Sequence, residues 1–566
     1  MPGAPTTTPR SFPVLCLLLL GCGAVPPRAG PEPPPASSTI EQAYQDLRYW
    51  TDQLQLAEYR GADRSPDGHS LPVMRDRAAA AHDRLASLLD AAVARGATGS
   101  DRPAVAAIRA AWAGGLGAAA LQDADSDHTG RLRCGYRADS IAALDRGLER
   151  LTRVMVGCYG AAASDIVLDG RRLDRLAILG LLPRTGDPDR RRRLFLALDP
   201  VWRSVNAGDE PGSPYRTLLR LRLATWGDSG SPLERKAPAF GLTTQELEGW
   251  LVQALEVWRA AMPDTLLEPW DWYYASGAAS RRLSPLLPAV ADIRRANDRY
   301  YSAIGAAPGR LGIHFDLEPR PGKYPVSLTT PGVRNRWIDG RFVPGEPWVV
   351  TSYIEGGFDN LAELLHETGH AIHLAALRSR PAFIDWPDND TFTEALADVP
   401  ALEAYEPGWQ IRYLGDSVGL AESIRAKYAG VVMDMTWALF EIRVYRTPGV
   451  DPNRLWSELT GRYLRIRPHP EWSWWAMRGQ LIDGPGYLIN YALGAFMAAD
   501  IRASARWQRG SFTAADTTLY PWLAGRLYRF GLERPSRMVL EEMLGRPLGR
   551  EALLKDMERL LRTAAR

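Results

Sequence analysis

The sequence Asn360-Leu-Ala-Glu-Leu-Leu-His-Glu-Thr-Gly-His-Ala-Ile-His373 contains the pattern His-Glu-x-x-His. Residues four apart lie one above the other on the same face of an α-helix. His366 and His370 can therefore bind one metal ion, and Glu367 would lie beside them, within reach of a water molecule on that ion. On its own a five-residue pattern can arise by chance, so its meaning depends on the flanking sequence and on a third ligand.

The residues around this pattern predict a helix. Asn360 followed three residues later by Glu363 is typical of a capping box. Apolar residues recur at helical spacing, and the basic residues and proline that follow predict the end of the helix; these positions are Leu361, Leu364, Leu365 and Ile372, then Arg378, Arg380 and Pro381.

A third ligand is predicted at Glu394, which follows His370 by 24 residues. A catalytic zinc site has three protein ligands and one open position, and a carboxylate suits the third place. If the segment around Glu394 is helical, Asp398 lies one turn later on the same face. There its carboxylate can accept the second N–H of a ligand histidine and so fix the tautomer. The sequence therefore predicts one Zn²⁺ per chain, held by His366, His370 and Glu394.

These residues resemble the gluzincin metallopeptidases. The segment 366–373 (HETGHAIH) is similar to the zinc helix of the thimet oligopeptidase and oligoendopeptidase F group, and 392–399 (FTEALADV) is similar to the third-ligand segment of angiotensin-converting enzyme and its peptidyl-dipeptidase relatives. The similarity is strongest over 348–496 and does not choose between the two groups. It implies a mostly α-helical, two-lobed metallopeptidase with a deep central cleft and a small β-sheet beside the zinc helix.

The same resemblance implies hydrolysis of peptide bonds in short peptides, by an oligopeptidase or a peptidyl-dipeptidase. Glu367 would be the general base for the attacking water. Tyr491, with Tyr487 four residues earlier, would stabilise the oxyanion, because tyrosines in this segment lie near the zinc in both groups. The histidine that accompanies them there is missing, and Gln480 or a neighbour stands at its place. His469 is the nearest candidate for that role.

Arg478 is a candidate for binding a substrate carboxylate. The alternative is that it is an ordinary surface arginine. Two other readings of the chain stay open. The first is a catalytically inactive zinc- or peptide-binding lipoprotein of the same fold. The second is a periplasmic interaction protein that uses the tryptophan-rich stretch 472–475, in which the His-Glu-x-x-His pattern is accidental.

The first residues predict export. Residues 1–22 are typical of a bacterial signal peptide ending in a lipobox, with Cys22 as the lipidated residue, although an ordinary signal peptide is the alternative. Residues 23–38 are rich in proline and predict an extended tether. The expected location is the periplasm or cell envelope, with membrane association only through lipid at Cys22. An oxidising compartment would permit a disulfide between Cys134 and Cys158.

The remaining chain, 39–566, is predicted to be one helical peptidase domain with its catalytic core at about 311–506. The whole chain of 566 residues is 46% hydrophobic, enough for a large core, and its net charge of +2 argues against a nucleic-acid partner. Helices are predicted over most of 39–310, among them 171–181, 191–205 and 283–304, and again at 421–446, 455–464 and 487–506. Short strands are predicted at 312–317, 324–328, 336–343 and 348–354, with a hairpin turn at Asp339-Gly340. The last of these strands either borders the cleft and binds an extended peptide or is purely structural.

Overall fold

The computed structural model describes residues 39–95, 101–116, 147–227, 231–324, 326–338 and 340–564. The leader, the tether, Cys22 and Cys134 lie outside these ranges. Cys158 is disulfide-bonded, and its pairing with Cys134 stays a prediction. Within the described ranges, no helix is both long and apolar enough to cross a membrane.

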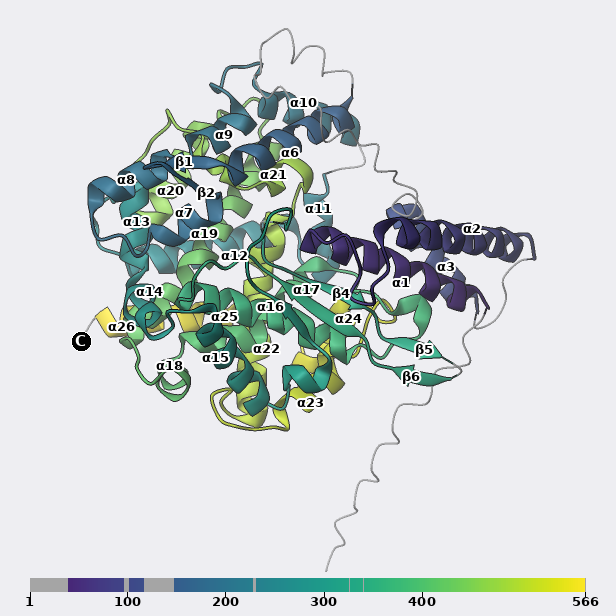
Figure 1. Cartoon of the computed structure of the whole chain (residues 1–566). Coiled ribbons are helices and arrows are strands. Elements are labelled where there is room, and N and C mark those ends of the chain that lie inside the picture. Colours follow the sequence, from purple (N-terminus) through teal and green to yellow (C-terminus); the bar gives the residue numbers. More distant parts are fainter. Residues whose placement is uncertain are drawn as a thin grey trace, which may run out of the picture.

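Helices form most of the molecule, as the sequence predicted (Figure 1). Those before the sheet are α1 (Thr39–Arg60), α2 (Leu71–Arg95), α3 (Asp101–Ala111), α6 (Leu148–Ser164), α7 (Arg175–Leu181), α8 (Pro188–Leu196), α9 (Asp199–Asn206), α10 (Pro214–Trp226), α11 (Leu233–Lys236), α12 (Thr244–Ala260), α13 (Pro269–Ser276), α14 (Ala278–Leu283) and α15 (Val290–Ala303).

The helices after the sheet include the ones that carry the predicted site. They are α16 (Phe358–Ala376), α17 (Asp390–Ala401), α18 (Pro407–Leu414), α19 (Leu420–Arg446), α20 (Pro452–Leu464), α21 (Gln480–Asp483), α22 (Leu488–Arg509), α23 (Leu519–Leu523), α24 (Ser536–Leu544), α25 (Glu551–Met557) and α26 (Arg559–Ala564).

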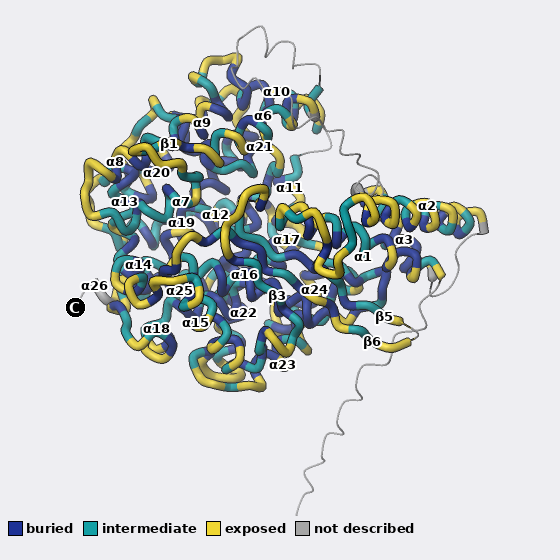
Figure 2. Tube along the Cα trace, viewed as in Figure 1, coloured by how far each residue is buried: buried dark blue, intermediate teal, exposed yellow. Residues whose placement is uncertain are grey.

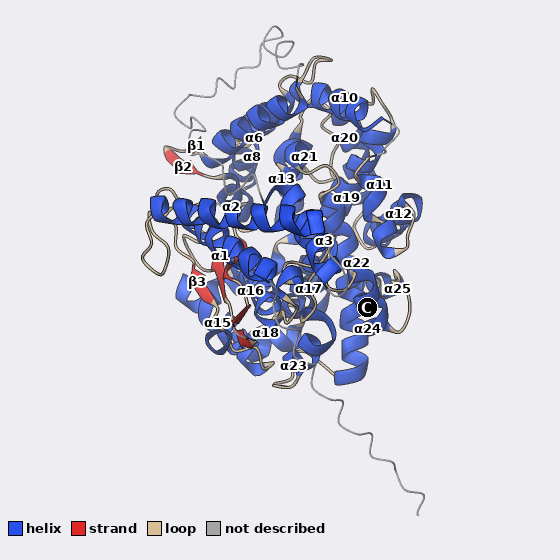
Figure 3. Cartoon of the chain, turned by 90° about the vertical axis from the view of Figure 1, so that its right-hand side faces the viewer, coloured by secondary structure: helices blue, strands red, loops and turns tan. Residues whose placement is uncertain are grey.

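The strands are short and lie on one side of the molecule (Figure 3). They are β1 (Ile166–Leu168), β2 (Arg171–Leu173), β3 (His314–Asp316), β4 (Leu328–Val333), β5 (Arg336–Ile338), β6 (Arg341–Val343) and β7 (Glu346–Val350). The three-stranded sheet has the order β3-β7-β4, with β7 parallel to β3 and antiparallel to β4. β1 pairs with β2, and β5 pairs with β6 across the predicted hairpin turn.

The helices are arranged in two lobes. In Figure 1 the upper lobe contains α6, α8–α10, α13, α20 and α21, and the lower lobe contains α15–α18, α22, α23 and the three-stranded sheet, with α1–α3 at its side. α19 packs against α12, α20 and α22 and so connects the lobes. Figure 2 shows buried residues concentrated along α16, α17 and α22, whereas the outward face of α2 is exposed. The lobes therefore share one apolar core around the helices of the predicted site.

The structure corrects several predicted boundaries. The strand predicted at 324–328 is wrong: β4 begins at Leu328 and continues through Pro331-Gly332, which look like a turn in the sequence. The register shifts between Thr330 and Val333, and a β-bulge of this kind tolerates proline and glycine inside a strand. Gly332 has φ +60°, and a Cβ there would meet the Trp348 side chain at 2.4 Å.

Three predicted helices are shorter or divided. The first residues of 171–181 form β2 instead of a helical turn. The helix predicted over 191–205 divides into α8 and α9, with Pro200 in the first turn of α9. The helix predicted over 283–304 starts only at Val290, because Pro285 and Pro288 interrupt it.

Candidate metal centre

α16 carries the His-Glu-x-x-His pattern as predicted, but it begins one turn earlier. Gly357 is its N-cap, so the predicted capping box at Asn360 is wrong; the Asn360 side chain lies inside the helix and donates to the main-chain oxygens of Glu355 and Gly356. The apolar positions at helical spacing are fully buried; they are Leu361, Leu364, Leu365 and Ile372. Burial of that face turns His366 and Glu367 toward a cavity.

Gly369 lets α17 approach α16 closely. A Cβ at this position would stand 2.4 Å from the main-chain oxygen of Ala397. This clash could not be relieved by a change of side-chain rotamer, because the atom that it meets belongs to the backbone. Only glycine therefore permits this contact between the two helices. The close contact brings Glu394, on the adjacent turn of α17, to the two histidines.

The three predicted ligands meet at one point. His366 Nε2 lies 3.1 Å from His370 Nε2 and 3.4 Å from Glu394 Oε2, and His370 Nε2 lies 3.8 Å from that carboxylate oxygen. Ligand atoms about 2.0–2.1 Å from a tetrahedral zinc ion stand about 3.3 Å from one another. The three separations match that value, and no other group of three such side chains in the described residues is close enough to hold an ion. The donor set therefore fits zinc.

Asp398 orients the first histidine. Its Oδ1 accepts from His366 Nδ1 at 2.8 Å, as predicted from the one-turn spacing to Glu394. This contact places the proton on Nδ1 and leaves the lone pair of Nε2 directed at the metal position. Nδ1 of His370 is buried and has no hydrogen-bond partner among the described residues.

The carboxylates dominate the electrostatics of these ligands without metal. Burial by itself would lower the pKa of His366, but Asp398 and Glu394 hold it well above its usual range. Burial would raise the pKa of Glu394, but its hydrogen bonds and charge interactions with both histidines hold it well below its usual range. Glu394 is thus ionised at neutral pH, as a zinc ligand must be.

His373, the last residue of the quoted stretch, belongs to the core. Both of its ring nitrogens are buried without a hydrogen-bond partner in the described chain, and its ring packs against Trp386 and Tyr528. Burial lowers the pKa of His373 to about 3, so the ring is neutral.

Glu367 lies next to the ligands and is held by the sheet. Thr329 Oγ1 stands 2.7 Å from Glu367 Oε2 and 2.8 Å from the main-chain oxygen of the same residue. One turn earlier on α16, Glu363 lines the same cavity, and burial together with the charge of Glu367 raises the pKa of Glu363 to about 7. The hydrogen bond from Thr329 thus holds the Glu367 carboxylate in the wall of the cavity that the metal ligands line.

Both predicted tyrosines line this cavity. Tyr487 is the N-cap of α22, its hydroxyl lies 3.4 Å from Glu394 Oε1, and its ring contacts that of Tyr491 edge-on. Burial and the charge of Glu394 raise the pKa of Tyr491 to about 12, against the opposing effects of Arg478 and of a hydrogen bond from Gln480. Gln480 thus contacts Tyr491.

The structure brings Arg478 to the cavity but does not bring His469 there. Arg478 forms an ion pair with Asp434, and its guanidinium lies 5.6 Å from the centre of the Tyr491 ring. His469 is held at 2.8 Å by Glu268 and at 2.7 Å by Glu471, and it stacks on Trp472. Its ring nitrogens are thus engaged outside the cavity that the metal ligands line.

The cavity over the ligands has a volume of about 500 Å³ and lies between the lobes. One side is the edge strand β4, and the others are α16, α17, α19 and the start of α22. The strand that borders it is β4, whereas β7, the strand for which the sequence left this role open, has partners on both sides. β3 and β4 are the two edge strands of this sheet, and of these it is β4 whose residues Leu328 and Thr329 line the cavity, where an extended peptide could add.

Sequence reasoning missed Thr329 and Trp386, which both line the cavity. Trp386 packs edge-on against His370 with ring centres 5.7 Å apart. Neither residue lies in a recognisable motif. A correct prediction of β4 would have placed Thr329 beside α16. No feature of the sequence indicates that Trp386 lines the cavity.

Comparison with solved structures identifies the fold. Metallocarboxypeptidase 1 of Trypanosoma cruzi matches with TM-score 0.53 and 16% identity, covering 92% of this chain and 98% of that one. The M32 carboxypeptidase of Deinococcus radiodurans R1 matches with TM-score 0.51 and 16% identity over 92% and 98%. A protein assigned as an oligoendopeptidase F matches with TM-score 0.54 and 15% identity over 93% and 97%.

The chain thus has the fold of these helical metallopeptidases. This confirms the predicted mostly α, two-lobed architecture with a small sheet beside the zinc helix. No protein-family model matches the sequence, and no curated protein matches it. The particular resemblance to angiotensin-converting enzyme and to thimet oligopeptidase stays a prediction.

Proposed function

We propose that the protein is a zinc-dependent peptidase that hydrolyses peptide bonds in short peptides. The observation that carries the proposal is the meeting of His366, His370 and Glu394 at tetrahedral separations beside Glu367. The fold shared with metallocarboxypeptidases and an oligoendopeptidase supports it. The intact base Glu367 speaks against an inactive zinc-binding protein, whose one support is the missing histidine.

Each residue has a role that follows from its position. Zinc, when bound by the three ligands, supplies a Lewis acid that polarises a carbonyl and lowers the pKa of water. Glu367 takes the proton of the attacking water and delivers it to the leaving amine. Asp398 keeps His366 in the ligating tautomer, and Tyr491, with Tyr487 beside it, donates to the oxyanion.

The shape of the site favours short, extended substrates. A cavity of about 500 Å³ between two lobes excludes a folded protein but accommodates a few residues of peptide. The start of β4 at Leu328 and Thr329, which lines the cavity, offers main-chain hydrogen bonds to such a peptide, and Arg478 offers a cation for a substrate carboxylate. Oligopeptidase and peptidyl-dipeptidase action are both compatible with this arrangement.

We also propose that the enzyme is exported to the periplasm or cell envelope and tethered through lipid on Cys22. The support is the sequence of residues 1–38. Peptides that enter the envelope would then be its substrates.

Replacing the base tests the proposal directly. Glu367→Gln keeps the shape of the side chain but removes its basicity, so we expect hydrolysis of quenched fluorescent peptides to fall by roughly 10²–10⁴-fold with zinc content unchanged. Glu458→Gln, on the exposed side of α20, is the matched control and should keep full activity. Undiminished turnover by Glu367→Gln would place the chemistry elsewhere and refute the mechanism.

A further inference from the structure

A second cavity of about 270 Å³ adjoins the metal cavity. Asp434 and Arg478 line both of them, so the ion pair of these two residues forms their common wall. The second cavity lies between α19 and the helices α7, α13 and α14. Nothing in the proposed mechanism uses this space.

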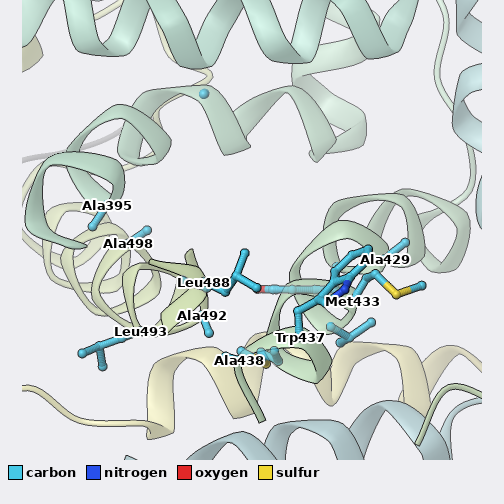
Figure 4. Close-up of a cluster of buried hydrophobic side chains, with 14 of the residues drawn as sticks. Ala395, Ala429, Met433, Trp437, Ala438, Leu488, Ala492, Leu493 and Ala498 are labelled. Atoms are coloured by element: carbon cyan, nitrogen blue, oxygen red, sulfur yellow. The ribbon is translucent and has the colours of Figure 1, made fainter. Parts of the chain in front are cut away.

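The wall of the second cavity is largely apolar. Along α19, Ala429, Met433 and Trp437 recur every four residues and so lie on one face of the helix, where Figure 4 shows them side by side. Trp272 and Met477 close the cavity from other elements. Met433, Trp437, Trp272 and Met477 are each less than 5% exposed. The charged residues in this wall are Arg175, Asp359, Asp434 and Arg478. The metal cavity is more acidic, with the carboxylates of Glu363, Glu367, Asp390 and Glu394 in its wall.

The size of the second cavity suits one aromatic side chain. An apolar cavity of about 150 Å³ is enough to bind benzene, and 270 Å³ leaves room for a larger ring. The Arg478 guanidinium lies 4.8 Å from the centre of the Trp437 ring. The Trp437 indole therefore lies next to the shared Asp434–Arg478 wall, on the side of the second cavity.

We propose that this cavity is a specificity subsite that takes a large apolar, preferably aromatic, side chain of the peptide substrate. The inference rests on the proposed peptidase function. A peptide that lies across the metal site would place the side chain of a residue close to the cleaved bond past the Asp434–Arg478 pair and into the apolar space. Removing the apolar surface of that side chain from water would favour such substrates over those with alanine at the same position.

Gly430 offers a way to fill the cavity without disturbing its walls. It lies in α19, lines the cavity, and a Cβ added to it would meet nothing within 4 Å. Leucine is also a better helix former than glycine, so Gly430→Leu should fold. Gly249→Leu is the matched control, because Gly249 is an exposed position in α12 whose Cβ would likewise meet nothing.

The experiment compares short peptides in which phenylalanine is moved, one position at a time, through an otherwise alanine sequence. For wild-type protein we expect kcat/KM to rise by roughly tenfold or more when phenylalanine occupies one particular position. Gly430→Leu should abolish that ratio, Gly430→Ala should reduce it, and Gly249→Leu should preserve it. An unchanged phenylalanine preference in Gly430→Leu overturns the subsite while leaving the peptidase proposal intact.

A binding measurement separates this proposal from the peptidase proposal. The same peptides are titrated by calorimetry into zinc-loaded Glu367→Gln protein and into the double variant Glu367→Gln/Gly430→Leu. The subsite is supported if one phenylalanine peptide binds more tightly than the alanine peptide to Glu367→Gln protein and this difference disappears in the double variant. This result would support the subsite even if wild-type protein hydrolyses none of the peptides. Equal binding of phenylalanine and alanine peptides refutes the subsite whatever the activity.

Discussion

The hydroxyl of Thr329 lies 2.7 Å from Oε2 of Glu367, and so the edge strand of the sheet holds the side chain that is proposed to act as the base. A threonine hydroxyl has a single hydrogen, which the carboxylate shares with the main-chain oxygen of the same residue at 2.8 Å. The strand and the zinc helix are thus connected at the point where a substrate would bind.

Thr329→Val should lower kcat without loss of zinc. The substitution keeps the shape and removes a hydrogen bond to a charged group, worth about 1.5–3 kcal/mol, so we expect a decrease of roughly 10–100-fold. Thr330→Val is the matched control, because the neighbouring hydroxyl is buried without a partner among the described residues and its removal should be harmless. Equal activities of the two variants would contradict a role for Thr329 in orienting Glu367.

Glu394→Ala should release the metal. Purified wild-type protein is expected to contain about one zinc per chain, and two histidines alone should not retain it through dialysis. Elemental analysis measures this directly. Asp390→Ala removes another carboxylate from the same cavity wall, one turn earlier on α17, and should leave the zinc in place. Full retention of zinc by Glu394→Ala would mean that the third ligand has been misassigned.

The two tyrosines should differ in their kinetic effects. The Tyr487 hydroxyl is already close to Glu394, whereas Tyr491 is expected to donate to the oxyanion. Tyr491→Phe should therefore lower kcat by about 10²–10³-fold with KM nearly unchanged. Tyr487→Phe should mainly raise KM. The opposite pattern would exchange the two roles, and normal kinetics for both variants would show that the rings only pack the wall.

Cys22→Ser should change the location of the protein. If Cys22 carries lipid, the native protein partitions with membranes, and the variant is either released or left unprocessed. Fractionation followed by mass spectrometry of the N-terminus measures both effects. Native protein that is wholly soluble and begins beyond Cys22 would favour an ordinary signal peptide.

Features that depend on residues close together in the chain could be predicted from the sequence. The spacing of His366 and His370, and of Glu394 and Asp398, is fixed by the helical repeat, so their arrangement could be predicted as soon as α16 and α17 were recognised. The mostly helical fold followed from apolar periodicity and from the resemblance carried by the same residues. The predicted element boundaries were wrong where proline or glycine is compatible with two structures. At Pro331-Gly332, for example, a bulged strand has the sequence of a turn.

Contacts between segments that are distant in the chain could be found only in the tertiary structure. The pairing of β4 with β7, at the edge of the sheet next to α16, placed Thr329 beside Glu367, 38 positions apart in the chain. The packing of α19 against α7, α13 and α14 produced the second, apolar cavity, which shares Arg478 with the metal cavity. His469 was the sequence candidate nearest to the tyrosines, yet its ring is held by Glu268 from a segment 201 positions away. Local periodicity cannot predict such partners, because they are chosen by how whole helices and strands pack.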